Sequence, residues 1–174
     1  MNAFLESLGY ERWILPALIV IPLAGALLVW AVGALGGKPR AGAAVEEGIV
    51  VADEWAQGRG ARALTLAIFV ALFVVSLGLW WSYDPMQTAA NWHAPIDLPW
   101  IPTWGVRFSL GVDGIAVMMI LLTTFLMPLA VLGSWTGIRT KPRAYYALLL
   151  LLTSGLLGVF MARDLFLFYV FWEI

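Results

Sequence analysis

The sequence has no cysteine and only one histidine, and these two scarcities exclude whole classes of functional site. Without cysteine, these residues form no disulfide, thiolate metal site, iron–sulfur ligation or cysteine nucleophile. The one histidine, His93, follows Trp92 in a long loop, where we expect a solvated side chain, since one imidazole does not build a metal site. The sequence shows no glycine-rich phosphate loop and no nucleophile–base pair. We therefore expect this chain to bind no metal and no cofactor.

Charged residues are also scarce. They make up 12% of the chain and hydrophobic residues 62%, whereas soluble domains are about a quarter charged and about half apolar. Ten tryptophans and five tyrosines suit a protein that is anchored at two membrane–water interfaces. The net charge of −1 gives no sign of nucleic-acid binding. The composition is that of an integral membrane protein, which has the lipid bilayer as a partner.

Four apolar runs are long enough to be transmembrane helices, because about 20 helical residues cross the ~30 Å hydrocarbon core of a bilayer. A fifth run, 165–174, has about half that length. We expect it to be the start of a span, truncated relative to a functional protein or completed by another chain. The sequence therefore predicts an all-α polytopic transmembrane helix bundle. Its four full spans are 13–35, 63–81, 115–135 and 145–162.

The segments between the spans differ in their content of basic residues. Seven of the ten Lys and Arg residues lie in 36–62 and 136–144, and the others lie in 1–12, 82–114 and the 163–164 turn. Basic residues favour the cytoplasmic side of a membrane. We therefore expect the two basic segments to be cytoplasmic loops, and the N-terminus and the 82–114 loop to be external, in the inner membrane of a bacterial cell.

The two longer loops differ in character. In 82–114, Pro and Gly alternate with aromatic and apolar residues, which predicts a small β-hairpin lying on the membrane surface. Asp113 ends this loop and should cap the third span, because Asp accepts hydrogen bonds from the free N–H groups of a helix N-terminus. The 36–62 loop is rich in Gly and Ala, so we expect a flexible connection with one short helix around 45–55.

Glu173 is the main candidate functional residue, because it ends an otherwise apolar and aromatic run that starts at Leu165. Eight residues into a helix, it would lie about 12 Å deep, near the middle of the membrane. A carboxylate there costs about 2.5–3.5 kcal/mol on insertion scales, so such groups mainly face a bundle interior, a water path or a partner charge. Burial disfavours the charged form and a nearby lysine favours it. Glu173 is thus predicted to load and release a proton. The alternative is a carboxylate at a membrane interface, where the chain simply ends.

The other polar residues near the spans suggest structural roles first. We expect Asp164 to cap the fifth helix, and Arg163 to reach lipid headgroups or to pair with Asp164. Small and hydroxyl-bearing residues interrupt two spans, where they allow close helix packing and hydrogen-bond to the backbone. The alternative is that they border a hydrated path. These residues are Thr123, Thr124, Thr153, Ser154, Gly155 and Gly158.

Two blocks of the sequence resemble a known family. The first runs from Leu-Pro-Trp-Ile-Pro at 98–102 to Phe-Ser-Leu-Gly-Val-Asp-Gly-Ile at 108–115. The second joins Gly-Val-Phe-Met-Ala at 158–162 to Asp-Leu-Phe-Leu-Phe-Tyr-Val-Phe-Trp-Glu at 164–173. In order and spacing, both resemble the N-terminal portion of the M-type (chain 4) antiporter-like membrane subunit of respiratory complex I, the proton-translocating NADH-quinone oxidoreductase. The resemblance is strong from about residue 98 onward and weaker before it.

This resemblance implies a role in proton translocation. In that family, the glutamate that corresponds to Glu173 is essential to the proton channel and pairs with a lysine on a later helix. The resemblance also implies that NADH, FMN, iron–sulfur clusters and quinone are bound by partner subunits, with no redox chemistry in this chain. Other membrane-arm subunits are the expected partners. The long 36–62 connection, Arg163 and the Thr153–Ser154 pair depart from the family pattern.

Two other functions stay open. Subunits of Mrp-type cation/proton antiporters share the Trp-Glu pattern, and there an ion gradient would drive the same carboxylate. The Leu-Pro-Trp-Ile-Pro block favours the M-type subunit over this alternative. A structural or assembly role for a short paralogue is suggested by the end of the chain at Ile174.

Overall fold

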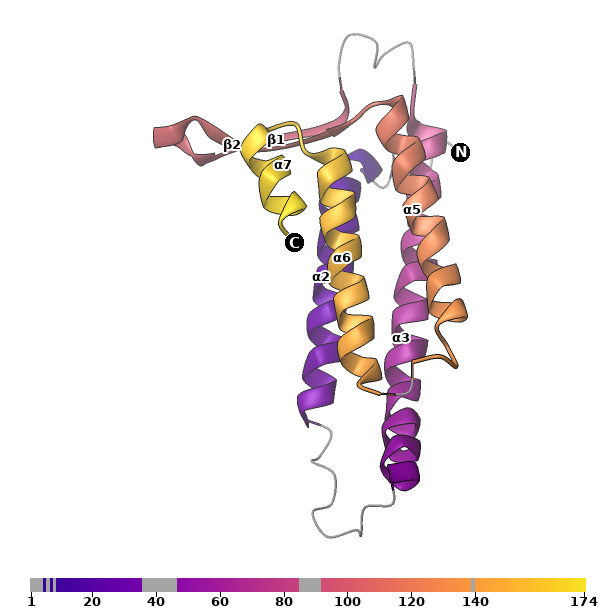
Figure 1. Ribbon diagram of the computed structural model, residues 1–174. Coiled ribbons are helices and arrows are strands. Elements are labelled where there is room, and N and C mark those ends of the chain that lie inside the picture. Colours follow the sequence, from indigo (N-terminus) through magenta and orange to yellow (C-terminus); the bar gives the residue numbers. More distant parts are fainter. Residues whose placement is uncertain (1–4, 6, 8, 36–46, 85–91, 139) are drawn as a thin grey trace.

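The computed structural model describes residues 5, 7, 9–35, 47–84, 92–138 and 140–174, with side chains omitted for 32–35 and 47–57. In this part of the chain, four long helices form a bundle, and a two-stranded hairpin and a short helix lie at one end of it (Figure 1). All four long helices contain stretches long and apolar enough to cross a membrane. The predicted helical membrane fold with a hairpin between the second and third spans is confirmed. The elements are α2 (Tyr10–Leu35), α3 (Glu47–Ser82), β1 (His93–Ile101), η1 (Pro102–Trp104), β2 (Val106–Val112), α5 (Gly114–Gly133), α6 (Pro142–Met161) and α7 (Leu165–Trp172).

The helix that contains the second span begins earlier than the apolar pattern indicates. The sequence predicts a loop over 36–62 with one short helix around 45–55, of which residues 36–46 lie outside the described part of the chain. Over 47–62 the prediction is wrong, because α3 runs without a break from Glu47 to Ser82. Its apolar, membrane-length part is Gly58–Ser82. The 47–82 segment contains no proline, and Ala, Glu, Gln and Arg within its polar part are good helix formers, which favours a helix that extends past the apolar stretch.

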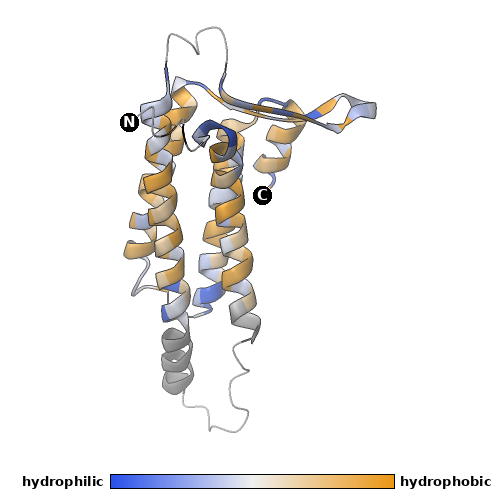
Figure 2. Ribbon diagram, turned by 180° about the vertical axis from the view of Figure 1, so that it is seen from behind, coloured by the Kyte–Doolittle hydropathy of each residue, from blue (hydrophilic) through white to orange (hydrophobic). Residues whose placement is uncertain are grey.

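The bundle core lies where α2 meets α6 and where α3 meets α5 (Figure 1). The outer faces of the helices are also apolar, as the orange helix bodies in Figure 2 show, and Leu27, Ile115 and Leu148 are more than 60% exposed. A helix in lipid can be apolar all round because the bilayer core is itself apolar. The fully buried large side chains of the core include Leu15, Leu18, Phe69, Leu72, Ile120, Leu150 and Leu157.

Several hydroxyl groups inside the bundle are bonded to neighbouring helices or to their own backbone. Ser76 Oγ on α3 lies 2.8 Å from Thr124 Oγ1 on α5, and Thr124 also donates to the carbonyl of Ile120. Ser154 on α6 donates to the carbonyl of Ile19 on α2 at 2.8 Å. These bonds link pairs of helices across the bundle core, so the packing interpretation of these residues agrees with the structure better than the hydrated path.

We expect the Ser76–Thr124 bond to contribute only about 0.6 kcal/mol to stability, the average for such bonds within membranes. The Ser76→Ala, Thr124→Ala and double variants are compared by reversible unfolding in bicelles. The difference between the double variant's loss of unfolding free energy and the sum of the two single losses gives the coupling between the side chains. Thr124 keeps its bond to Ile120 in the Ser76→Ala variant, which limits the loss. A coupling well above about 2 kcal/mol would show that the pair belongs to a larger polar network.

The hairpin crosses the end of the bundle at which α2 begins and α3 ends, and it reaches sideways over α7 (Figure 1). β1 and β2 are antiparallel, and Gly105 takes a left-handed conformation in the turn, with φ 69°. Arg107 Nε donates to Asp97 Oδ1 across the strands at 2.7 Å. This hydrogen bond lowers the pKa of Asp97, so the pair persists at neutral pH and is lost only when the pH falls below the usual aspartate range.

The expectation of a solvated His93 is wrong. Its side chain is only 7% exposed, and Nε2 lies 3.0 Å from Ser82 Oγ at the end of α3. The ring also meets the ring of Tyr83 edge-on, with 5.8 Å between centroids. The start of β1 folds back onto the start of α2 and the end of α3, which covers a residue that the sequence places in a long loop.

Candidate functional site

The candidate site is α7, the short helix that carries Glu173 at its C-terminal end. Its first turn is capped by Asp164, whose Oδ1 accepts from the backbone N–H groups of Phe166 at 2.9 Å and Leu167 at 3.2 Å. The other carboxylate oxygen accepts from the backbone N–H of Arg107 on β2 at 3.3 Å. The expected capping role of Asp164 is confirmed, and the same side chain joins the helix to the hairpin.

Asp164→Ala should weaken α7 by about 1 kcal/mol, because the helix loses its N-terminal acceptor. Asp164→Asn keeps an acceptor oxygen and should cost less. Hydrogen–deuterium exchange of the 165–174 peptide in the intact protein measures this, with faster exchange expected for the alanine variant alone. Equal exchange in both variants would mean that packing, and not the cap, holds this helix.

Backbone contacts tie the segment before α7 to the hairpin. The N–H of Arg163 donates to the carbonyl of Ser109 at 2.9 Å, and Ala162 forms a bridge with Leu110. The Arg163 guanidinium lies 5.0 Å from the centre of the Trp92 ring, so the partner that the structure gives it is an aromatic face, not the expected Asp164. The position of α7 therefore depends on the hairpin.

Two glycines of α6 let α7 approach closely. A methyl group at Gly155 would lie 3.1 Å from the carbonyl oxygen of Phe171, and one at Gly158 would overlap the Phe171 ring. Phe171 is largely buried in this contact, and so is Leu167 one turn earlier. Gly155 and Gly158, which the sequence predicts to be packing residues, thus form the surface of α6 on which α7 packs.

Glu173 lies on the opposite, outward side of α7. Its N–H donates to the carbonyl of Tyr169 at 3.1 Å, which closes the last turn, and its side chain is exposed. Leu165 and Tyr169, which share this face at four-residue spacing, are 83% and 59% exposed. The eight residues of α7 before Glu173 correspond to about 12 Å of helix, and its depth in a membrane stays a prediction. Among the described residues, none forms an ion pair with it.

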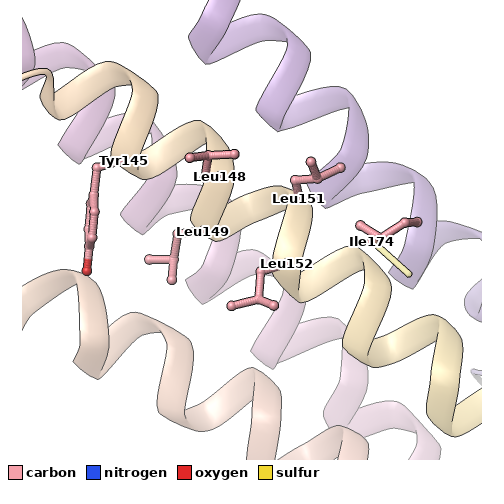
Figure 3. A pocket seen from close by; sticks show the side chains of 6 residues that line it. All are labelled: Tyr145, Leu148, Leu149, Leu151, Leu152 and Ile174. Atoms are coloured by element: carbon pink, nitrogen blue, oxygen red, sulfur yellow. The ribbon is translucent and has the colours of Figure 1, made fainter. Parts of the chain in front are cut away.

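The surface beside the end of α7 is apolar. Leucines of α6 line a hollow of about 310 Å³ that Ile174 closes on one side (Figure 3). A second hollow of about 220 Å³ is lined by Gly155, Phe171 and Trp172, among others. Neither offers groups that would hold a charged cofactor. Within the described ranges, no three His, Asp or Glu side chains come together as a metal site.

Comparison with known proteins identifies the family to which this chain belongs. The chain is 36% identical over 165 residues to NADH-quinone oxidoreductase subunit M of Escherichia coli (strain K12), covering 92% of this chain. It is 33% identical over 173 residues to NAD(P)H-quinone oxidoreductase chain 4 2 of Synechococcus sp. (strain JA-3-3Ab), covering 98% of this chain. The chain is a homologue of these M-type, or chain 4, subunits. No family model matches the chain.

This M-type chain spans only part of the length of its relatives: 28% of the Escherichia coli protein and 30% of the Synechococcus protein. A third relative, NAD(P)H-quinone oxidoreductase chain 4 2 of Thermosynechococcus vestitus, is 39% identical over 118 residues, which cover 68% of this chain and 22% of that protein. The family resemblance drawn from the hairpin and α7 motifs is confirmed.

Sequence reasoning missed two features of this M-type chain outside the α7 site. One is Ser76, a lone hydroxyl in an apolar run, which could have been noticed as the counterpart of the Thr pair at 123–124. The other is the contact of His93 with Ser82 and with Glu11, whose Oε1 lies 3.9 Å from His93 Nε2. No sequence signal joins these three residues, because their contact depends on how the hairpin folds back.

Proposed function

We propose that this chain is part of a proton-translocating membrane subunit of NADH:quinone oxidoreductase, in which quinone reduction drives proton transfer across the membrane. The relatives named above support this, since they are subunits of quinone oxidoreductases. The observation that carries the proposal is the position of Glu173: a carboxylate at the end of an eight-residue apolar helix, one helix-length below the hairpin.

The proposed proton transfer by Glu173 depends on what covers the exposed face of α7. A carboxylate facing lipid at this depth is costly, so we propose that protein covers this face and supplies a cation. The family resemblance points to a lysine on a later helix. A carboxylate between a dry environment, which favours its protonated form, and a lysine, which favours its charged form, changes protonation when that lysine moves.

We propose that the N-terminus, the hairpin and the start of α7 face the outside of a bacterial inner membrane. The start of α2, the hairpin and the start of α7 lie at one end of the bundle, while the end of α2, the start of α3 and the α5–α6 connection lie at the other (Figure 1). Seven of the ten basic residues belong to the segments at that second end, which supports a cytoplasmic location for it.

The proposed partners are the other membrane-arm subunits and the lipid bilayer. NADH, FMN, iron–sulfur clusters and quinone would be bound by partner subunits. This chain would contribute proton transfer and no redox step.

Purification of the chain with its partners from native membranes tests the proposed function. We expect flavin- and iron–sulfur-containing subunits to copurify, with NADH:quinone oxidoreductase activity in the complex. Copurification with small membrane subunits that lack redox centres, together with cation-dependent proton exchange, would assign the chain to an Mrp-type antiporter instead. Isolation of the chain alone would point to the structural role.

A further inference from the structure

His93 joins three elements at the hairpin end of the bundle. Its Nε2 is within hydrogen-bond distance of Ser82 Oγ on α3 and lies 3.9 Å from Glu11 Oε1 in the first turn of α2. Its ring packs edge-on against Tyr83. His93 is also the first residue of β1 and pairs with the fully buried Val112 of β2. We call His93, Ser82 and Glu11 the clasp, because they meet where the hairpin packs on the two helices.

The backbone next to the clasp is strained. Ala94 is buried and has φ 50°, a left-handed conformation that residues with a Cβ rarely adopt. The strand register also shifts between His93 and Ile96. Such strain persists only where neighbouring contacts hold it. Release of His93 would therefore let this end of β1 relax.

The surroundings of His93 favour its neutral form. Burial lowers its pKa below 6.5, and the Glu11 carboxylate raises it only in part. The Arg163 guanidinium lies over the ring of Trp92, the residue before His93 in the chain. Asp113, which follows Val112, is engaged in capping α5 through the N–H of Ala116, and Asp84 follows Tyr83 in the chain.

We propose that His93 is a pH-sensitive clasp that releases the first part of β1 when its imidazole is protonated. Because the pKa in the folded chain is below that of a free histidine, the clasp is stable above about pH 6.5 and weakens as the pH falls below that value. Half of Glu11 is exposed, so protons can reach the clasp from the hairpin side. Acidification on that side is the predicted signal.

The clasp is connected to α7 through the hairpin. β2 holds the segment before α7 by the Ser109–Arg163 bond, the Leu110–Ala162 bridge and the contact of Arg107 with Asp164. A change at the start of β1 would therefore reach the helix that carries Glu173. This consequence rests on the proposed function: acid on the outlet side of a proton pump would loosen the helix that bears its carboxylate. The pH response of the clasp itself does not depend on that function.

Maleimide labelling of a single cysteine tests the clasp, because these 174 residues contain no natural cysteine. Val112→Cys places a buried thiol opposite His93, and Thr103→Cys places an exposed thiol at the hairpin tip as the reference. In the detergent-solubilised full-length protein with its partners, labelling of this peptide is followed by mass spectrometry from pH 8 to pH 5. The ratio of the two labelling rates removes the pH dependence of the reagent. We expect this ratio to rise several-fold as the pH falls.

Two further substitutions distinguish release through His93 from a general loosening of the protein at low pH. His93→Gln keeps a neutral hydrogen-bonding side chain, and we expect its labelling ratio to stay low at every pH. Glu11→Gln removes the charge that favours the imidazolium, and we expect the midpoint to move to lower pH. A flat ratio in the parent, the same rise in His93→Gln, or an unmoved midpoint in Glu11→Gln would overturn the proposal. None of these readouts uses proton pumping, so failure of the pumping function leaves them intact.

Discussion

In the Glu173→Gln variant, proton pumping should fall on the order of a hundredfold, the lower range of what a positioned proton-transfer group contributes. Glutamine keeps the size and the hydrogen-bonding ends of the side chain but carries no exchangeable charge. The backbone bond to Tyr169 and the Phe171 contact with α6 do not involve the carboxylate, so the complex should assemble normally. NADH-driven acidification of inverted membrane vesicles, with the linked quinone reductase rate, measures the effect.

Asp97→Asn is the matched control for Glu173→Gln. It also removes one carboxylate, but from the exposed side of the hairpin, where the partner is Arg107. We expect pumping close to the parent level in this variant. Full pumping in Glu173→Gln would show that this carboxylate is not part of the proton path. Loss of the assembled complex in that variant would show a structural role for Glu173.

Gly158→Ala should lower stability by about 1–3 kcal/mol, the usual range for overpacking a well-packed contact. The added methyl group meets the Phe171 ring near its attachment to the backbone, where the side chain has little room to move. In an open helix position the same change would stabilise by up to about 1 kcal/mol, because Ala favours helix over Gly. Thermal unfolding of the purified complex, with exchange of the 165–174 peptide, reports the loss and its location.

Gly133→Ala provides the control, because a methyl group at that position of α5 meets no atom within 4 Å. Its stability should be unchanged or slightly higher. Phe171→Leu reduces the ring that causes the overlap, so the Gly158→Ala/Phe171→Leu pair should lose less than the sum of the single changes. Additive losses would place the effect of Gly158→Ala somewhere other than the α6–α7 contact.

Local chemistry made several parts of the fold predictable. Asp113 and Asp164 were identified as caps because Asp directly before an apolar run has one main local role, and both accept the expected N–H groups. The hairpin was predictable because Pro and Gly at short spacing interrupt an apolar segment. The start of α3 at Glu47 was not, since the apolar pattern reports where a helix meets lipid and not where the helix begins.

The sequence was enough to propose Glu173 as the candidate site residue, but not to predict how that residue is arranged in the fold. Glu173 stands out from the sequence because a carboxylate in an apolar run is rare and costly. Its outward orientation follows from Phe171, which turns the opposite side of α7 onto two glycines of α6. An all-apolar helix has no polar face to indicate which side meets protein, so the sequence alone cannot assign this orientation.

By itself, the sequence determined the membrane class, the four spans, the hairpin, the caps and the family, because each depends on neighbouring residues or on a motif of fixed spacing. The tertiary structure alone decided the burial of His93 against Ser82, the Ser76–Thr124 bond and the Arg163–Trp92 contact. Each of these joins different structural elements. In a membrane protein both the core and the lipid-facing surface are apolar, so hydropathy cannot tell which residues meet, and only the packed chain brings these partners together.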